Sequence, residues 1–213
     1  MANLRRQPVQ ERGQQRIDRI LDAADALFAD VGYEQATTNA IAQHAGTSIG
    51  SLYQFFRDRR GVLEALAQRY RDRLHAMHET IFTETMARRP LEEIYDVVLR
   101  HLSDFHAQNR GFQPLFYGSS TSGELAQAGE LVRRECITRI DGMLAVRLPQ
   151  LEPARRELLA TINFEVTRAL LSLAARGDAH FREQILGEIK ALLLGYMQQQ
   201  LGPEPTEGTP CTG

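Results

Sequence analysis

Apolar residues recur at spacings of three and four along almost the whole chain, and this periodicity is the strongest constraint on its fold. Between residues 17 and 31 the apolar side chains are Ile17, Ile20, Leu21, Ala24, Leu27, Phe28 and Val31. Such spacing places them on one face of an α-helix, whereas a half-buried strand requires strict alternation. No segment gives a convincing strand pattern. The sequence therefore predicts an all-α protein.

Glycines, prolines and capping residues divide this pattern into about nine helices. Gly32 and Gly46 end the first two, since glycine tolerates the left-handed conformation common at helix ends. The longest predicted helix begins at Asp58 and is limited by Pro90; its 30 or so residues would span about 45 Å, enough to belong to two domains. Four segments are expected: a flexible basic arm (1–12), a three-helix DNA-binding domain (13–60), a larger helical domain (61–201) and a disordered tail (202–213).

Charge and cysteine content narrow the class of protein. The net charge of −2 argues against a chain that coats polyanions with its whole surface. The first 73 residues nevertheless hold eleven arginines and nine acidic residues, which favours DNA binding at that end. Only Cys136 and Cys211 are present, too few for a disulfide framework. No secretory signal and no run of roughly 20 apolar residues occurs, so we expect a cytoplasmic protein.

The stretch from Thr37 to Val62 is the most informative part of the chain. It reads as two short helices joined at Gly46, with Ile41 and Ala45 facing inward on the first and Leu52 on the second. The small Ala42 allows the helices to cross closely. A tight turn between two short helices is typical of a helix-turn-helix, whose second helix enters the major groove of DNA.

The outward face of the second helix is short and polar. Hydroxyl groups near a helix N-terminus suit phosphate oxygens, Gln54 can read an adenine edge, and Gly50 lets the backbone approach the duplex. Arginines at the start of the long helix can flank the groove. The predicted DNA-binding residues are Thr37, Thr38, Thr47, Ser48, Gly50, Ser51, Tyr53, Gln54, Arg57 and Arg59.

This segment resembles the DNA-binding region of the TetR family of bacterial regulators, and the similarity extends back through the helix that ends at Gly32. The matching pairs and runs are Thr37-Thr38, Ile41-Ala42, Ala45-Gly46, Gly50-Ser51-Leu52-Tyr53 and Phe56. The resemblance implies a phosphate-binding lysine at the position of Arg59, where the charge is kept but a guanidinium replaces an ammonium. It also implies a homodimer that binds a palindromic operator and is released by a small molecule.

The resemblance implies that the larger helical domain holds an effector pocket, and aromatic residues concentrate in this part of the chain. Polar residues interrupt the apolar pattern after residue 162, which favours an apolar or amphipathic effector with few polar anchors. Ordinary hydrophobic core remains the alternative for each of these residues. The predicted ligand-binding residues are Phe82, Tyr95, Leu102, Phe105, Phe112, Phe116, Tyr117, Met143, Asn163 and Thr167.

The last helix carries more apolar surface than one neighbouring helix can bury. Gly187 and Gly195 lie within it, where glycine lowers helix stability and close helix approach across a dimer is one explanation. A local bend is the alternative. The predicted dimer-interface residues are Phe181, Ile185, Ile189, Leu192 and Tyr196.

Catalytic and metal-binding patterns are lacking. The sequence contains no Cys-x-x-Cys, His-Glu-x-x-His or Glu-x-x-His motif and no phosphate-binding loop. We therefore predict a transcriptional regulator with no cofactor or metal and no enzymatic activity, with ligand-released repression as the mode. An activator, a corepressor-dependent regulator and a non-catalytic helical ligand-binding protein remain as alternatives.

Overall fold

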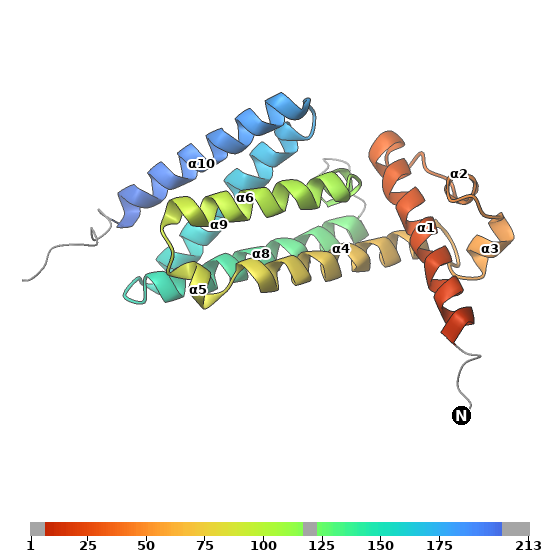
Figure 1. Cartoon of the computed structure of the whole chain (residues 1–213), viewed down its shortest axis with the longest axis horizontal. Helices are drawn as coiled ribbons and strands as arrows, with labels where there is room; N and C mark the ends of the chain where they lie inside the picture. The colour runs from red at the N-terminus through yellow and green to blue at the C-terminus, as the bar shows by residue number, and fades with distance from the viewer. Residues whose placement is uncertain (1–6, 117–122, 202–213) are drawn as a thin grey trace, which may run out of the picture. The chain divides into compact units, whose positions relative to one another are not determined.

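The structure, a computed structural model, describes residues 7–116 and 123–201 and contains only helices in those ranges (Figure 1). The predicted disordered tail (202–213) and Tyr117 lie outside the described residues. The helices are α1 (Gln7–Val31), α2 (Thr38–His44), α3 (Ile49–Tyr53), α4 (Arg59–Ile81), α5 (Glu84–Ala87), α6 (Leu91–Gln108), α7 (Phe112–Phe116), α8 (Gly123–Arg147), α9 (Pro153–Ala174) and α10 (Ala179–Leu201). The all-α prediction is confirmed.

Two boundaries differ from the sequence-based expectation. Residues 7–12, expected in a flexible arm, form the first turns of α1. The single helix expected between Asp58 and Pro90 ends at Ile81, and Thr83 begins α5 by accepting a hydrogen bond from the backbone N–H of Met86 at 3.1 Å. A hydroxyl in this position satisfies one of the free N–H groups of a new helix. The described residues therefore form ten helices where about nine were expected.

The chain divides into two compact units. The first comprises residues 1–79 and 104–134, and the second comprises residues 80–103 and 135–213. Most of α4 thus belongs with α1, α2 and α3, although the sequence suggested a boundary at residue 60. The core of the helix-turn-helix part includes Ile20, Phe28, Ile41, Leu52 and Leu66, each fully or almost fully buried.

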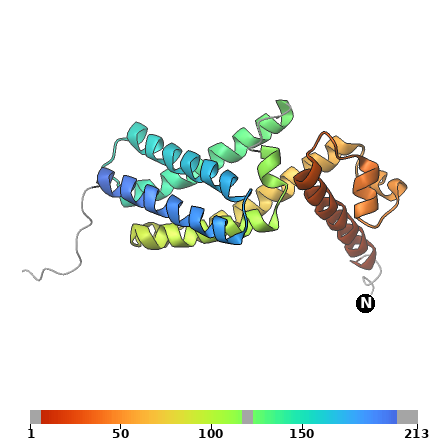
Figure 2. The ribbon, with the colours of Figure 1, turned by 90° about the horizontal axis from the view of Figure 1, so that it is seen from above.

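The second unit is built around α9 and α10, which lie side by side in both views (Figures 1 and 2). Pro153 occupies the first turn of α9, where its missing N–H is not needed. Arg156 on α9 binds Asp141 on α8 at 2.8 Å, and Lys190 on α10 binds Asp96 on α6 at 2.7 Å. These ion pairs connect α9 and α10 to the neighbouring helices of the unit.

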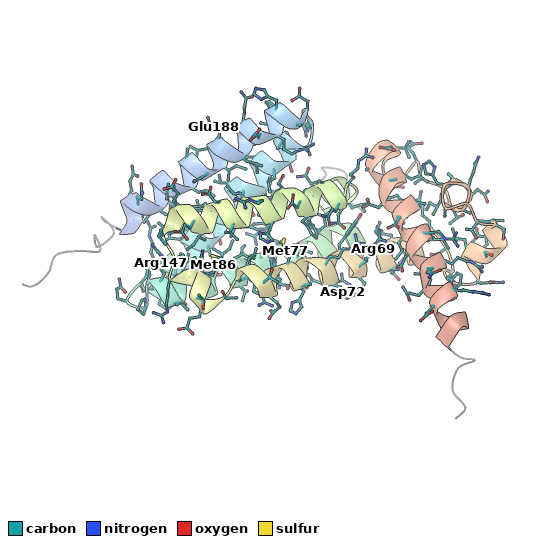
Figure 3. All side chains as sticks on the ribbon, in the orientation of Figure 1. Arg69, Asp72, Met77, Met86, Arg147 and Glu188 are labelled. Carbon is teal, nitrogen blue, oxygen red and sulfur yellow. The ribbon has the colours of Figure 1, made fainter. Side chains whose placement is uncertain are left out.

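Arg147, the last residue of α8, contacts the end of α5 and the segment that follows it (Figure 3). Its guanidinium donates to the backbone carbonyl of Arg89 at 2.6 Å and to that of Ala87 at 3.3 Å. Carbonyl groups at a helix end have no partner within the helix. Arg147 therefore stabilises the C-terminal end of α5 from a distant part of the sequence.

Candidate nucleic-acid interface

The turn between α2 and α3 has the geometry expected of a helix-turn-helix. Gly46 adopts φ +60°, in the left-handed region that glycine occupies without strain. The backbone N–H of Thr47 then donates to the carbonyl of Ala42 at 3.0 Å. Ala42, Leu52 and Phe56 are buried inside the corner. The two helices therefore meet at a fixed turn, and α3 is free to present its other face.

The outward face of α3 is polar and accessible. Tyr53 is 52% exposed, and Gly50 and Gln54 are also exposed. Arg57 is exposed just beyond α3, whereas Thr47 and Ser51 are half-buried. A donor-rich surface of this size on a short helix suits contact with base edges and phosphates.

Tyr53 is held in place from the preceding helix. Its hydroxyl lies 3.1 Å from the hydroxyl of Thr38 at the start of α2. One of the two oxygens donates to the other, so the donor's proton is used and the second proton remains available to a phosphate oxygen. The contact joins two predicted DNA-binding residues that are fifteen positions apart.

Thr37 and Ser48 serve as N-caps of α2 and α3. The Thr37 hydroxyl oxygen accepts from the backbone N–H of Ala40, and that of Ser48 accepts from the N–H of Ser51, both at 3.1 Å. Capping uses each oxygen as an acceptor and leaves its O–H as a donor. Both residues can therefore cap a helix and donate to an anion at the same time.

Arg59, where the resemblance implies a phosphate contact, binds the loop between α1 and α2 within the chain. One nitrogen of its guanidinium donates to the carbonyl groups of Tyr33, Glu34 and Ala36 at 2.8–3.1 Å. The other lies 3.4 Å from the Glu34 carboxylate, and the group stacks on the Tyr33 ring at 4.3 Å. Arg59 is therefore engaged with the loop between α1 and α2.

Asp25 was not singled out from the sequence, yet it connects three elements of the first unit. Its carboxylate accepts hydrogen bonds from the Tyr70 hydroxyl on α4 and from the backbone N–H of Gly111, the latter at 3.0 Å. Burial, followed by the charge of Asp25, raises the pKa of Tyr70. The available signal was an acidic residue next to the apolar face of the first helix.

The predicted ligand-binding residues fall into separate groups. In the second unit, the Tyr95 hydroxyl donates to the Asn163 side-chain oxygen at 2.6 Å, and the Asn163 amide donates to the carbonyl of Leu159 at 2.8 Å. This buried pair links α6 to α9. Phe82, Leu102, Met143 and Thr167 are half-buried, and the side chain of Phe116 is not described.

In the first unit, Phe105 and Phe112 pack edge to face with ring centroids 5.0 Å apart. The His106 ring packs against Phe112 at 5.6 Å, and burial lowers the pKa of His106 to about 4. Its Nδ1 and the Gln113 side-chain nitrogen are buried and lack a hydrogen-bond partner within the described residues. Both residues were missed as ligand candidates, although a polar residue beside aromatic ones was a usable signal.

The predicted dimer-interface residues differ in exposure. Leu192 is 56% exposed, and Phe181, Ile185 and Tyr196 are half-buried. Ile189 is fully buried within the second unit, so it packs inside the chain and does not form part of an outer surface. Two further exposed leucines, Leu158 and Leu173, lie on α9 and were missed.

Metal binding and membrane insertion have no support in the part of the chain that is described. No group of three or more His, Cys, Asp or Glu residues there is placed to hold a metal ion. None of the described helices is long and apolar enough to cross a membrane. Cys136 is buried, and this burial raises the pKa of its thiol to about 12.

Comparison with known proteins identifies two family regions. Residues 20–66 match the family described as bacterial regulatory proteins, tetR family, and residues 90–197 match the tetracyclin repressor-like C-terminal domain. The chain is 38% identical over 58 residues to the HTH-type transcriptional repressor Rv1474c of Mycobacterium tuberculosis, which is 27% of this chain and 31% of that protein. It is 28% identical over 128 residues to the HTH-type transcriptional repressor KstR of Rhodococcus jostii, 56% of this chain and 57% of that protein. The matches thus span about a third and just over half of these relatives.

A solved structure extends the similarity over most of the chain. The SmeT–triclosan complex superposes with a TM-score of 0.67 over 92% of this chain and 96% of that one, at 22% identity. This likeness concerns the fold alone. The matched regions include the helix-turn-helix and the helical region that follows it, so the chain belongs to the TetR family of bacterial regulatory proteins.

Proposed function

We propose that this protein is a cytoplasmic transcriptional repressor that binds a palindromic operator as a homodimer and is released by a small molecule. The observation that carries the proposal is the α2–α3 corner, with a left-handed Gly46 at the turn and an exposed polar face on α3. Such a corner supports insertion of α3 into the major groove. The membership of the chain in the TetR family supports the same function.

The proposed contacts divide into base reading and phosphate binding. Gln54 and Tyr53 are exposed on α3 and are the candidates for base edges. The remaining candidates lie around them, and their hydroxyl, backbone or guanidinium groups suit phosphates. These are Thr37, Thr38, Thr47, Ser48, Gly50, Ser51 and Arg57.

Arg59 supports DNA binding in a different way from the other residues. Three carbonyl groups of the α1–α2 loop accept its hydrogen bonds, and this loop leads directly to Thr37, the N-cap of α2. Arg59 is therefore a positioning residue, which fixes where α2 begins relative to α4. The fork of a guanidinium suits this task because it donates in several directions within one plane.

The proposed dimer surface lies on the exposed sides of α9 and α10. Leu158 and Leu173 on α9 and Leu192 on α10 are 41–56% exposed. On α9, Ile162, Val166 and Ala169 continue the line between the two leucines at helical spacing and are half-buried or exposed. Burying such a surface against the same surface of a second copy gives a symmetric dimer. Gly187 and Gly195 have open space where a Cβ would stand, which permits close helix approach.

Effector binding is proposed for the helical region that follows the helix-turn-helix. The SmeT–triclosan complex has the same fold and holds a small molecule, which supports effector binding by this chain. Near the turn between α6 and α7, the unpartnered Nδ1 of His106 and nitrogen of Gln113 lie among aromatic rings. An amphipathic molecule with a few hydrogen-bonding groups suits such surroundings.

In this proposal, the hydrogen bonds of Asp25 transmit the effect of effector binding to the helices that bind DNA. Gly111 begins the turn into α7, and Asp25 lies on α1, which packs against α2. An effector that favours one position of the α6–α7 turn would bias the position of α1 through this hydrogen bond. For release, the effector must favour the DNA-free form by a coupling free energy, which is typically about 1–3 kcal/mol.

A mobility-shift assay with the DNA upstream of the protein's own gene tests the proposal. The wild type is compared with a Tyr53→Ala, Gln54→Ala variant, and with a Gln198→Ala, Gln199→Ala control whose residues are exposed at the end of α10. We expect a shift that resists nonspecific competitor, persists in the control and is lost in the α3 variant. A specific shift that the α3 variant retains would rule out α3 as the reading helix.

A further inference from the structure

The first turns of α1 carry two separated stripes of charge. Arg12, Arg16 and Arg19 follow one another at spacings of four and three, so they lie on one side of the helix. The acidic residues Glu11, Asp18 and Asp22, spaced by seven and four, lie on another side. Charged residues that served only solubility would not need to be segregated by sign onto different sides of the helix.

The acidic stripe is turned toward the rest of the first unit. Asp22 binds Arg69 on α4 at 2.6 Å, and Asp25, three residues on, binds Tyr70 and Gly111. Arg16 precedes Asp25 by nine residues, about two and a half helical turns, so it points to the opposite side of α1. The arginine stripe therefore faces away from α4 and away from the α6–α7 turn.

The three arginines carry charge that the described part of the protein does not neutralise. Arg12 and Arg19 are exposed and Arg16 is half-buried, and no hydrogen bond or ion pair within the described residues engages them. Some other exposed arginines are paired: Arg88 binds Glu84 at 2.6 Å, and Arg134 binds Glu130 at 2.9 Å. Arg57, Arg100 and Arg176 are exposed without such a side-chain contact within the described residues, but they lie far apart in the sequence. On α1, three arginines without a partner in the described part of the chain thus fall within eight consecutive residues.

Figures 1 and 2 show that these turns of α1 extend beyond α2 and α3 in both views. They precede the segment matched to the DNA-binding family region, which starts at residue 20. From Arg12 to Arg19 the helix rises about 10 Å. One DNA strand presents about three phosphates over that length. The number and spacing of the arginines suit this array.

We propose that the face formed by Arg12, Arg16 and Arg19 is a second DNA-binding surface, which binds backbone phosphates beside the groove that α3 enters. The inference rests on the proposed DNA-binding function and adds a contact outside the helix-turn-helix. Phosphate contacts of this kind carry no sequence information. They raise affinity for every duplex and make it more dependent on salt.

The test measures how binding to a random-sequence duplex of roughly 30 base pairs changes between about 50 and 200 mM salt, because the slope of log K against log salt counts phosphate contacts at about 0.9 each. The variant R12Q/R16Q/R19Q is compared with the wild type. The control R88Q/R89Q/R100Q removes three exposed arginines of the second unit and changes the net charge equally. A third variant, R12K/R16K/R19K, keeps the charge.

We expect the glutamine variant at α1 to lose about two or more units of slope per dimer and about ten-fold or more in affinity at low salt. The control and the lysine variant should keep the wild-type slope, and circular dichroism should show all proteins folded. An unchanged slope in the α1 variant, or an equal loss in the control, would overturn the inference. A wild type that shows no salt-dependent DNA binding would overturn the proposed function as well.

Discussion

Gly111 donates its backbone N–H to the carboxylate of Asp25 at 3.0 Å, which joins the start of α7 to the C-terminal half of α1. The Tyr70 hydroxyl on α4 donates to the same carboxylate. One buried side chain thus links α1, α4 and the α6–α7 turn within the first unit. The same side chain thus ties the α6–α7 turn to α1, the helix that packs against α2.

Gly111 leaves no room for a side chain. A Cβ at this position would stand 2.8 Å from the backbone oxygen of Asp25 and 2.9 Å from the Tyr70 hydroxyl. We expect Gly111→Ala to lower the free energy of unfolding by about 1–3 kcal/mol, the usual cost of overpacking. Gly142→Ala is the matched control, because that glycine lies in α8 with open space around it and alanine favours a helix by up to about 1 kcal/mol. Urea unfolding of both variants measures the difference, and equal stabilities would contradict this account of the contact.

Arg59→Lys separates positioning from phosphate binding. An ammonium keeps the charge but cannot reproduce the planar set of hydrogen bonds to Tyr33, Glu34 and Ala36. We expect weaker operator binding with an unchanged salt slope, since no phosphate contact is lost, and faster amide exchange in the α1–α2 loop. In Arg57→Lys, where the exposed cation is kept, affinity should change little. For Arg59→Gln, a drop of about one unit of salt slope per subunit would instead assign Arg59 to a phosphate.

His106 makes stability depend on pH. Burial lowers its pKa to about 4, below the value of about 6.5 in an unfolded chain, so the unfolded state binds more protons between these values. The free energy of unfolding should therefore fall as pH drops from about 6.5 toward 4, by up to about 1.4 kcal/mol per pH unit from this residue. In His106→Gln this part of the pH dependence should vanish, while His180→Gln, which changes an exposed ring, should keep it. Denaturation at several pH values gives the comparison; parallel curves for His106→Gln and wild type would show that the ring does not titrate in this way.

The exposed leucines of α9 and α10 should govern dimerisation. Leu173→Glu and Leu192→Glu change residues that are 41% and 56% exposed, so the fold of one chain should tolerate them. Burying a leucine is worth about 1.5–3 kcal/mol, so each substitution should weaken the dimer by about ten-fold or more. Leu131→Glu alters an equally exposed leucine on α8 as a control. Sedimentation velocity distinguishes the outcomes, and a dimer that survives both α9 and α10 substitutions would place the interface elsewhere.

Local signals in the sequence were sufficient for most of the fold. Thr37, Gly46 and Ser48 determine their caps and turn through neighbouring atoms, so the helix-turn-helix could be predicted in detail. The start of α1 was missed, although Pro8 near its first turn is a known start signal. The break before α5 was missed because the apolar pattern continues past it, and the N-cap Thr83 that marks the start of α5 was not noticed.

Contacts between distant residues could not be predicted in the same way. Asn163 was predicted as a polar anchor for a ligand, and its partner Tyr95 lies 68 positions away. Nothing in the local pattern shows that the two residues hydrogen-bond to each other. The same holds for Arg59, whose acceptors are carbonyl groups 23–26 residues earlier in the chain. The family resemblance predicts a positive charge at position 59, but tertiary packing determines which groups this side chain contacts.

The central claim, that α3 reads a specific operator, is tested most directly by selecting binding sites from random-sequence DNA with the full chain. The proposal predicts enrichment of a palindrome whose half-sites are separated by about one helical turn, roughly 10 base pairs, or a multiple of it. The Tyr53→Ala, Gln54→Ala variant should enrich no such site, because its exposed α3 side chains are removed. Failure of the wild type to enrich any common sequence, or enrichment of the same palindrome by the variant, would contradict the claim.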